Sequence, residues 1–336
     1  MAKVVEDYFS FYKEKNVLIT GGLGFIGSNI AHKLVALGAN VIIVDSLIPT
    51  YGGNLFNVES IKDKVHINLA DIRSEHTMQV VVKEQDIIFN IAGQVSHIDS
   101  MKDPYPDLDI NCRAQLSLLE AVRANGLPDV KIIFAGTRQV YGKPVYLPLD
   151  EKHILQPTDV NGINKMAGEW YHILYHNVYG INACSLRLTN TFGPRQLMKH
   201  SRQGVIPWFV RKILDNEQIE LFGGGEQLRD MNYVDDVVDA FLRAGAMKKS
   251  DGNFYNLGHH HPVSLKNFVK MLIEVNGSGG YIEVPFPQEK KKIDIGDSYC
   301  SYFKIKSELG WEPKTDLKEG IRMMLEYYKK YKQHYW

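Results

Sequence analysis

The chain has 336 residues, 44% of them apolar and 23% charged, which is typical of a globular protein with a sizeable core. Its 39 basic residues balance its 39 acidic residues, so no net charge attracts it to nucleic acid or to a membrane, and we expect neither as a partner. The three cysteines, Cys112, Cys184 and Cys300, are far apart, and this excludes a disulfide framework or a zinc site.

The first predicted elements form a strand, a helix and a second strand. NVLIT (16–20) is an apolar run that stops at glycines, GFIGSNIAHKLVALG (24–38) has helical spacing, and NVIIVD (40–45) is a second apolar run. Three such elements within about thirty residues are typical of the βαβ unit of a parallel sheet.

The alternation of strands and helices continues to residue 190. We expect strands at 64–71, 87–93, 130–137 and 182–190, and helices at 111–126 and 161–180. Strands that are apolar throughout imply a sheet covered by helices on both faces. The predicted fold class is therefore α/β, with a Rossmann-like, doubly wound parallel sheet.

The pattern changes after residue 190, where Pro and Gly are more frequent and the segments are shorter. A helix is expected at 233–247, and a strand, a turn and a helix at 254–275. We place a Rossmann-like domain at residues 1–190 and a smaller substrate-binding lobe at residues 191–336. Two arrangements stay open: a separate lobe, or a lobe with segments that return to the main sheet.

A glycine-rich loop follows the first strand. Gly21, Gly24 and Gly27 form a G-x-x-G-x-x-G pattern, which lets the backbone approach a pyrophosphate at the amino terminus of a helix. Asp45, at the end of the second strand, can accept hydrogen bonds from both ribose hydroxyls and would repel a 2′-phosphate. The sequence therefore predicts NAD as the cofactor, in preference to NADP.

Further cofactor contacts are expected at later strand ends. Asp71 can receive the adenine amino group and Ile72 can pack on the ring, although an ordinary strand-end carboxylate is an equal alternative for Asp71. Ala92 and Gly93 place small residues where a ligand must come close to the sheet. The expected cofactor-binding set also includes Phe25, Ile26, Ser46 and Lys165.

Seven blocks in order cover nearly the whole chain: TGGLGFIG, FNIAGQVS, AGTRQVYG, NGINKMAGE, RLTNTFGPRQ, RDMNYVDDV and ELGWEPKTDLKEGI. On these blocks the chain resembles the extended short-chain dehydrogenase/reductase family, and within it the NAD-dependent nucleotide-sugar epimerases and dehydratases. The resemblance implies a Rossmann-like domain that holds NAD and a carboxy-terminal lobe that holds a nucleotide diphosphate sugar. It also implies a homodimer paired through the helices expected at 111–126 and 161–180.

The resemblance further implies a catalytic set of Ser/Thr, Tyr and Lys. Thr137 matches the hydroxyl that would bond the reacting sugar oxygen, and Lys165 matches the lysine that binds the nicotinamide ribose. Asn190 and Arg229 match positions that meet the substrate diphosphate, for which the fork of an arginine is suited. A strand-end hydroxyl and a surface salt bridge are the alternatives for Thr137 and Arg229. The expected substrate-binding set is Arg138, Asn190, Arg195 and Arg229.

One departure from the family pattern concerns proton transfer. The position of the tyrosine, four residues before Lys165, holds Asn161, and a carboxamide has no usable proton-accepting state. Asn161 is expected beside the nicotinamide, between Thr137 and Lys165, as a hydrogen-bonding placeholder. The general base then lies elsewhere: His97 is the first candidate, because imidazole titrates near neutrality. The other candidates are Lys165 acting through Thr137, Asp99 and Asp159.

A second departure follows Thr137. Sugar 4,6-dehydratases of the family carry an acidic pair there, whereas this chain has Arg138 and Gln139. Neither residue can serve as that acid or base, and this argues against 4,6-dehydration. Arg138 is expected either to hold an anionic or hydroxyl-rich part of the substrate or to have a structural role.

Three functions remain to be compared. The leading hypothesis is an NAD-dependent nucleotide-sugar epimerase, an isomerase in which tightly bound NAD oxidises the sugar transiently. The second is a protein that binds NAD and a nucleotide sugar without turnover, for which Asn161 is the main support. The third is another sugar-nucleotide conversion, by a dehydratase or a decarboxylase.

The sequence also bears on metal binding and location. His259, His260 and His261 are adjacent, but neighbouring histidines rarely face one ion, so we expect a turn there and no metal. MAKVVEDYFSFYKEK (1–15) lacks an apolar core of signal-peptide length, and no later run could span a bilayer. We therefore expect a cytoplasmic protein.

Overall fold

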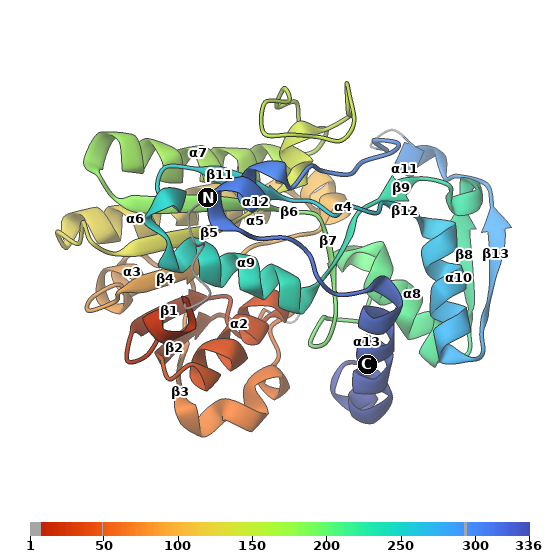
Figure 1. Ribbon diagram of the computed structural model, residues 1–336, viewed down its shortest axis with the longest axis horizontal. Coiled ribbons are helices and arrows are strands. Elements are labelled where there is room, and N and C mark those ends of the chain that lie inside the picture. Colours follow the sequence, from red (N-terminus) through yellow and green to blue (C-terminus); the bar gives the residue numbers. More distant parts are fainter. Residues whose placement is uncertain (1–7, 49, 292–293) are drawn as a thin grey trace.

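The computed structural model describes residues 8–48, 50–291 and 294–336. Within these ranges, seven strands form one parallel sheet in the order β11-β6-β5-β4-β1-β2-β3 (Figure 1). The strands are β1 Asn16–Thr20, β2 Asn40–Asp45, β3 Val65–Leu69, β4 Ile87–Asn90, β5 Lys131–Thr137, β6 Asn182–Leu188 and β11 Phe254–Leu257. The predicted Rossmann-like, doubly wound sheet is confirmed.

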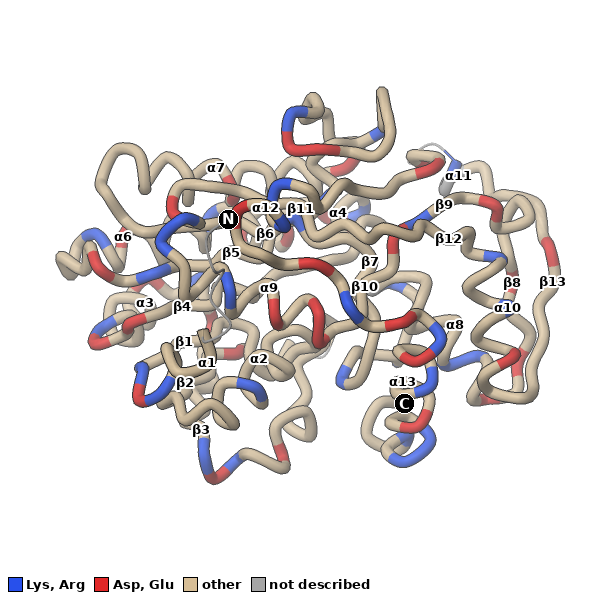
Figure 2. Tube along the Cα trace, in the orientation of Figure 1, with Lys and Arg blue, Asp and Glu red and all other residues tan. Residues whose placement is uncertain are grey.

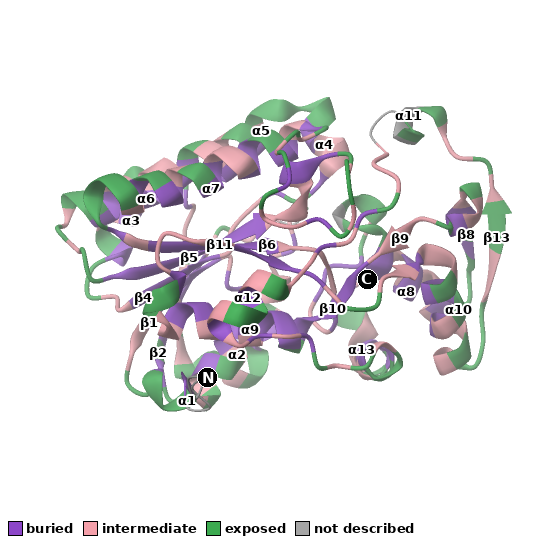
Figure 3. Cartoon of the chain, turned by 45° about the horizontal axis from the view of Figure 1, so that its top comes forward, coloured by how far each residue is buried: buried purple, intermediate pink, exposed green. Residues whose placement is uncertain are grey.

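Helices cover both faces of this sheet, because alternate side chains of each strand point to opposite sides. Leu18 and Ile88 belong to the apolar cluster under α3, α6 and α7, whereas Ile19 and Phe89 belong to the cluster under α2 and α9. Figure 3 shows the strands buried between these two layers. The helices are α2 Phe25–Ala36, α3 Glu75–Val81, α6 Ala114–Ala124, α7 Val160–Tyr179 and α9 Val234–Ala246.

The remaining elements are short segments and a lobe beside the sheet. Around the sheet lie α1 Tyr8–Phe11, α4 His97–Lys102, α5 Pro104–Leu108 and α12 Phe303–Leu309. The strand pairs of the lobe are β7 Asn190–Phe192 with β10 Met231–Tyr233, β8 Gln218–Phe222 with β13 Gly280–Val284, and β9 Leu228–Arg229 with β12 Val263–Ser264. Its helices are α8 Val205–Leu214, α10 Leu265–Asn276, α11 Gln288–Lys291 and α13 Leu317–Tyr331.

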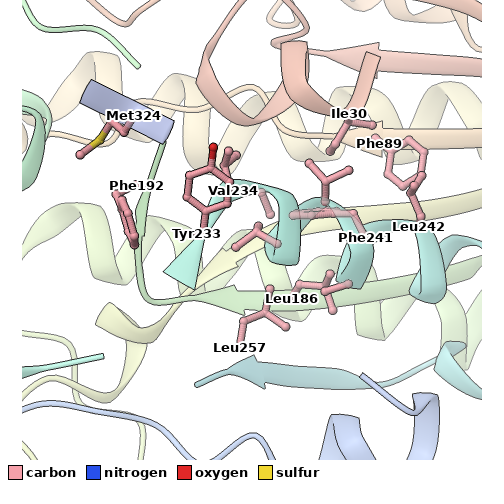
Figure 4. Close-up of a cluster of buried hydrophobic side chains, with 14 of the residues drawn as sticks. Ile30, Phe89, Leu186, Phe192, Tyr233, Val234, Phe241, Leu242, Leu257 and Met324 are labelled. Atoms are coloured by element: carbon pink, nitrogen blue, oxygen red, sulfur yellow. The ribbon is translucent and has the colours of Figure 1, made fainter. Parts of the chain in front are cut away.

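The part of the chain after residue 190 is joined to the main sheet by a strand and by a shared apolar core. β11 lies after residue 190 in the sequence, yet it pairs with β6 from Phe254 opposite Ser185 to Leu257 opposite Leu188. One apolar cluster runs from Phe89 in β4 through α9 to Met324 in α13 (Figure 4). The sheet and the lobe beside it therefore share one apolar core.

A buried ion pair ties α7 to β6. The guanidinium of Arg187 meets both carboxylate oxygens of Glu169, with Nε at 3.1 and 3.0 Å, and the two side chains are 0% and 1% exposed. Ser185 donates a further hydrogen bond to Glu169, and Nη1 of Arg187 donates to the Tyr141 hydroxyl. Both charges are thus fully satisfied inside the protein, which a buried pair requires.

The described residues contain no helix that is both long and apolar enough to cross a membrane. Residues 1–7, the first part of the amino-terminal stretch considered above, lie outside the described residues. Basic and acidic residues are interspersed along the described trace (Figure 2). The three cysteines are free thiols, and the rings of His259 and His260 stack at 4.4 Å. No group of three or more His, Cys, Asp or Glu in the described ranges is arranged to hold a metal ion.

Candidate functional site

A cleft runs along the carboxyl ends of the strands and reaches the start of α8. This edge of a doubly wound sheet is where such folds bind ligands. The structure brings most of the predicted site residues together in its lining: Gly21, Gly24, Phe25, Ile26, Asp45, Ser46, Asp71, Ile72, Ala92, Gly93, His97, Thr137, Arg138, Asn161, Lys165 and Asn190. Gly27, Arg195 and Arg229 are outside the lining.

The glycine loop has the close approaches that its sequence implies. Gly21 has φ of +69°, and a Cβ there would lie 2.8 Å from the backbone nitrogen of Ala92. A Cβ on Gly27 would overlap the carbonyl oxygen of Gly21, so a glycine at this position allows α2 to pack closely against the loop. The N-terminus of α2 has no side-chain cap, which leaves its N–H groups available to a pyrophosphate.

Asp45 both shapes this loop and faces the cleft. Its carboxylate accepts hydrogen bonds from the backbone N–H groups of Leu23 at 3.0 Å and Leu47 at 2.9 Å. Burial raises the pKa of Asp45, and the two backbone donors oppose that rise. The glycine cradle and a carboxylate at the expected ribose position fit a dinucleotide with a free 2′-hydroxyl.

The Asp45 carboxylate should set the preference between the two dinucleotides. In Asp45→Ala, the ratio of the dissociation constants for NADP and NAD should fall by roughly tenfold, because the repulsion of a 2′-phosphate is removed. Fluorescence titration of both cofactors measures this ratio. Asp45→Asn is the matched control for the loop, since one oxygen can still accept a backbone hydrogen bond. Equal affinity of the unaltered protein for NAD and NADP would contradict the role assigned to Asp45.

At the end of the cleft where the adenine is expected, the Asp71 carboxylate pairs with Arg73. The guanidinium reaches both carboxylate oxygens, at 3.0 Å from Nε and 2.6 Å from Nη2. The hydrogen bonds from Arg73 lower the pKa of Asp71. Asp71 is thus an ionised acceptor at the cleft wall, and its neighbour Ile72 is buried beside it.

At the other end of the cleft, Thr137 and Lys165 line the same wall. Thr137 is the last residue of β5, and its hydroxyl oxygen accepts the N–H of Gln139 at 3.2 Å. The ammonium of Lys165 donates to the carbonyl of Ala135 at 2.9 Å and lies 4.7 Å from the centre of the Phe134 ring. Burial lowers the pKa of Lys165 to about 8, against the opposing effect of Asp107.

Asn161 is 2% exposed, and its side-chain amide is hydrogen-bonded to neighbouring residues. Its Nδ2 donates to the carbonyl oxygen of Gln94 and to the carboxylate of Asp107, both at 2.8 Å. Asn164 donates to the other oxygen of the same carboxylate at 2.8 Å. The amide hydrogens of Asn161 are therefore committed to a structural network around Asp107.

His97 stands at the first residue of α4 and is 39% exposed along its side chain. Its Nδ1 is 2.5 Å from a carboxylate oxygen of Asp159, and its Nε2 contacts the side-chain amide of Gln139. Asp159 also caps α7 by accepting the N–H of Gly162 at 2.7 Å. Burial alone would raise the pKa of Asp159, but the hydrogen bond and charge of His97 bring it below its usual value.

The four predicted substrate-binding residues face different surroundings. Asn190 lines the cleft and donates to the carbonyl of Asp230 at 3.2 Å. Arg195, with φ of +73°, turns towards α2 and donates to Asn29 at 2.7 Å. Arg229 donates to the carbonyls of Leu228 and Gly296, whereas Arg138 lines the cleft and donates to Ser298.

Several polar residues at the site were missed by the sequence reasoning. Three of these residues are each at most 1% exposed: Gln94, Asp107 and Asn111. Gln94 and Asp107 accept hydrogen bonds from the amide of Asn161. Asn111 is hydrogen-bonded to Gln94 in the loop before His97. Asp107 and Asn111 are spaced four apart in the sequence, but the helix expected at 111–126 does not include Asp107. The π-helical turn at Asp109–Arg113, which carries Asn111, has no sequence signature.

Comparison with known proteins identifies the family. The family model described as NAD dependent epimerase/dehydratase family matches residues 17–258, well over half of the chain. This chain belongs to the NAD-dependent epimerase/dehydratase family. NAD is accordingly its cofactor, in keeping with the glycine loop and Asp45 at the cleft.

Individual members of the epimerase/dehydratase family resemble the chain over nearly its whole length. A putative UDP-glucose 4-epimerase of Methanocaldococcus jannaschii is 36% identical over 93% of this chain and 98% of its own. The crystal structure of a Thermotoga maritima UDP-glucose 4-epimerase with UDP-glucose has a TM-score of 0.86 and 34% identity, covering 94% and 99% of the two chains. The NAD complex of the Thermus thermophilus enzyme has a TM-score of 0.83 and 30% identity, covering 94% and 99%.

Proposed function

We propose that this protein is a nucleotide-sugar epimerase in which His97, oriented by Asp159, replaces the family tyrosine as the proton-transfer group. The observation that carries the proposal is the Asp159–His97 pair in the wall of the cleft that also contains Thr137 and Lys165. NAD, when bound, supplies reversible hydride transfer at one sugar carbon. The fold of the relatives and the nucleotide sugars in their names support a substrate of that class.

The Asp159 carboxylate fixes which nitrogen of His97 carries the proton. A carboxylate only accepts hydrogen bonds, so Nδ1 of the imidazole must be the donor in that contact. Nε2 is then the nitrogen that carries the lone pair, as a general base requires. A carboxylate behind an imidazole also stabilises the imidazolium that forms when a proton is taken up.

Gln139 is suited to both protonation states of His97. Its amide N–H can donate to the lone pair of neutral Nε2, which is the contact in this structure. Its oxygen, buried and without a hydrogen-bond partner among the described residues, can accept from Nε2–H of the imidazolium after the amide turns over. The amide must give way when Nε2 takes the substrate proton. Gln139 is therefore a positioning residue for His97.

Lys165 is the competing base. Its lowered pKa, about 8, makes a neutral amine accessible near physiological pH, and it could act through the hydroxyl of Thr137. The two assignments differ in pH dependence. With Lys165 as base, kcat/KM of the unaltered protein rises through about pH 8, and this rise persists in His97→Gln.

A binding protein without turnover is the second candidate function. The observation that favours it is the commitment of both amide hydrogens of Asn161 to Gln94 and Asp107. Dehydration or decarboxylation of a nucleotide sugar stays a third alternative, since the family includes dehydratases by its description.

Mass spectrometry of the small molecules released on denaturation tests the proposal. We expect NAD and a nucleotide sugar, and we expect incubation with UDP-sugars to give a second sugar epimer by NMR. A ketone or a shortened sugar would identify a dehydratase or decarboxylase. A nucleotide sugar that is bound and never converted would establish the binding protein in place of the enzyme.

We further propose that residues 191–336 hold the substrate while residues 1–190 hold NAD.

We also propose that the protein is a homodimer whose interface is formed by α6 and α7. Ile163, Trp170, Leu174 and Val178 form an apolar stripe along α7 and are each about half exposed, between 46% and 59%. Exposed apolar rows of this kind mark interfaces. The neighbouring Ile173 and Tyr175, at most 8% exposed, face the sheet.

Sedimentation velocity at micromolar concentration tests the dimer. We expect a dimer for the unaltered protein and a monomer for Leu174→Glu, because a charge in the centre of an apolar interface is not compensated. Ile282→Glu is the matched control: Ile282 is 48% exposed on β13, at the far side of the lobe from α7 (Figure 1). A monomer for the unaltered protein would contradict the proposal.

A further inference from the structure

Arg138 is a cation in the cleft wall without a carboxylate in contact. Its Nη1 donates to the hydroxyl of Ser298 at 3.1 Å. Among residues 8–48, 50–291 and 294–336, no ion pair includes it. A guanidinium that faces a ligand cleft and lacks an ionic partner is suited to an anionic group on the ligand.

A second guanidinium lies behind it. Arg229 forms an isolated β-bridge with Ser298, the residue whose hydroxyl Arg138 contacts. The Nη1 of Arg229 is held by the carbonyls of Leu228 at 2.8 Å and Gly296 at 2.6 Å. Burial and then the charge of Arg138 lower the pKa of Arg229 to about 10, so the two cations repel each other. An anion in the cleft would relieve this repulsion.

Asp230 is a buried carboxylate that interacts with both guanidinium charges but forms no ion pair with either among the described residues. Asp230 follows Arg229 and is fully buried, and one of its oxygens accepts the backbone N–H of Cys300 at 2.9 Å. Its other oxygen has no hydrogen-bond partner among the described residues, so neither arginine fork contacts it. Burial raises the pKa of Asp230 to about 6.

The position of Arg138 along the cleft indicates which part of a ligand it meets. It directly follows Thr137 and directly precedes Gln139, whose amide contacts His97. Those neighbours surround the place where the sugar would react. Arg138 lines the cleft there, whereas Arg229 lies outside the lining. The diphosphate of a nucleotide sugar would lie one sugar ring away from the reacting carbon. It is therefore a less favoured partner for Arg138 than a group on the sugar itself.

We infer that the sugar of the substrate carries a carboxylate, which the guanidinium of Arg138 binds, with Arg229 adding positive charge from behind. This inference rests on the proposed function and specifies its substrate class: a nucleoside diphosphate sugar acid in place of a neutral hexose. A carboxylate matches the arginine fork by two parallel hydrogen bonds. A neutral hydroxyl would leave the Arg138 guanidinium without an ion-pair partner among the described residues, since its side-chain contact is the Ser298 hydroxyl.

Isothermal titration of the NAD-loaded protein with UDP-glucuronate, UDP-glucose and UDP tests the inference. The unaltered protein should bind UDP-glucuronate about tenfold to a hundredfold more tightly than UDP-glucose, the usual scale of a charge-assisted hydrogen bond. Arg138→Gln should abolish that difference by weakening UDP-glucuronate, and Arg138→Lys, which keeps the charge without the fork, should retain part of it. Arg322→Gln removes an exposed arginine on α13 and is the control for net charge.

Two results would overturn the inference while the proposed function stands. One is equal affinity of the unaltered protein for UDP-glucuronate and UDP-glucose. The other is an Arg138→Gln protein, shown to be folded by its melting curve, that loses the same factor for UDP-glucuronate, UDP-glucose and UDP, since the arginine would then bind the diphosphate. Retention of NAD with no binding of any of the three probes would overturn the proposed function and the inference together.

Discussion

His97→Gln should lower kcat by about a hundredfold or more, the usual scale for loss of a general base. Glutamine keeps a polar side chain of similar reach, but it cannot take up a proton. Loss of the base should leave KM for the nucleotide sugar and the dissociation constant for NAD near their original values. Steady-state kinetics and a cofactor titration on the same preparation separate these quantities.

Asn161→Ala is the comparison variant for His97→Gln. Its loss of activity should be modest, because the amide of Asn161 is bonded to Gln94 and Asp107 and moves no proton. Its stability should fall by about 1–3 kcal/mol, since a fully buried carboxylate loses a donor. If Asn161→Ala abolished turnover and His97→Gln did not, the assignment of the base would be wrong.

Glu169→Gln should reduce the free energy of unfolding by about 3–5 kcal/mol, as expected when one partner of a buried ion pair is neutralised. Arg187 would keep its charge at 0% exposure, with a donor group facing it in place of one carboxylate oxygen. Urea unfolding followed by circular dichroism measures the change. The effect should appear in stability and in NAD affinity, because α7 carries Lys165 one turn away.

An exposed pair provides the control for Glu169. Glu274 and Lys318 are 2.9 Å apart, but their side chains are 64% and 52% exposed. Glu274→Gln should change the free energy of unfolding by less than about 1 kcal/mol, because water already solvates both groups. Equal losses for Glu169→Gln and Glu274→Gln would show that burial of the first pair does not determine its contribution.

The cofactor half of the site could be predicted because its signals are local. Gly21, Gly24 and Asp45 are fixed by one strand, loop, helix and strand, and the structure places them together at the cleft. The parallel sheet covered by helices on both faces follows from the same alternation of elements. Such patterns depend on neighbours in sequence, which propensity and periodicity describe.

The catalytic half depends on contacts between distant segments. His97 and Asp159 were both named as candidate bases, yet their pairing across 62 residues has no sequence signal. Asp107, 54 residues from Asn161, was missed for the same reason. The orientation of Arg195 depends on a backbone φ of +73°, which the residue type does not predict. Tertiary packing decides these cases.

The attachment of Asn161 has a consequence for how this site can evolve. A tyrosine at position 161 would bring a phenol to the cleft, but it would also withdraw an N–H from the buried carboxylate of Asp107, which Asn164 alone would then satisfy. Two positions in one buried network do not contribute additively to stability. A tyrosine at position 161 is therefore expected to be tolerated only with a change at Asp107 before or together with the change at Asn161. Positions 107 and 161 are thus expected to tolerate substitution as a pair better than singly.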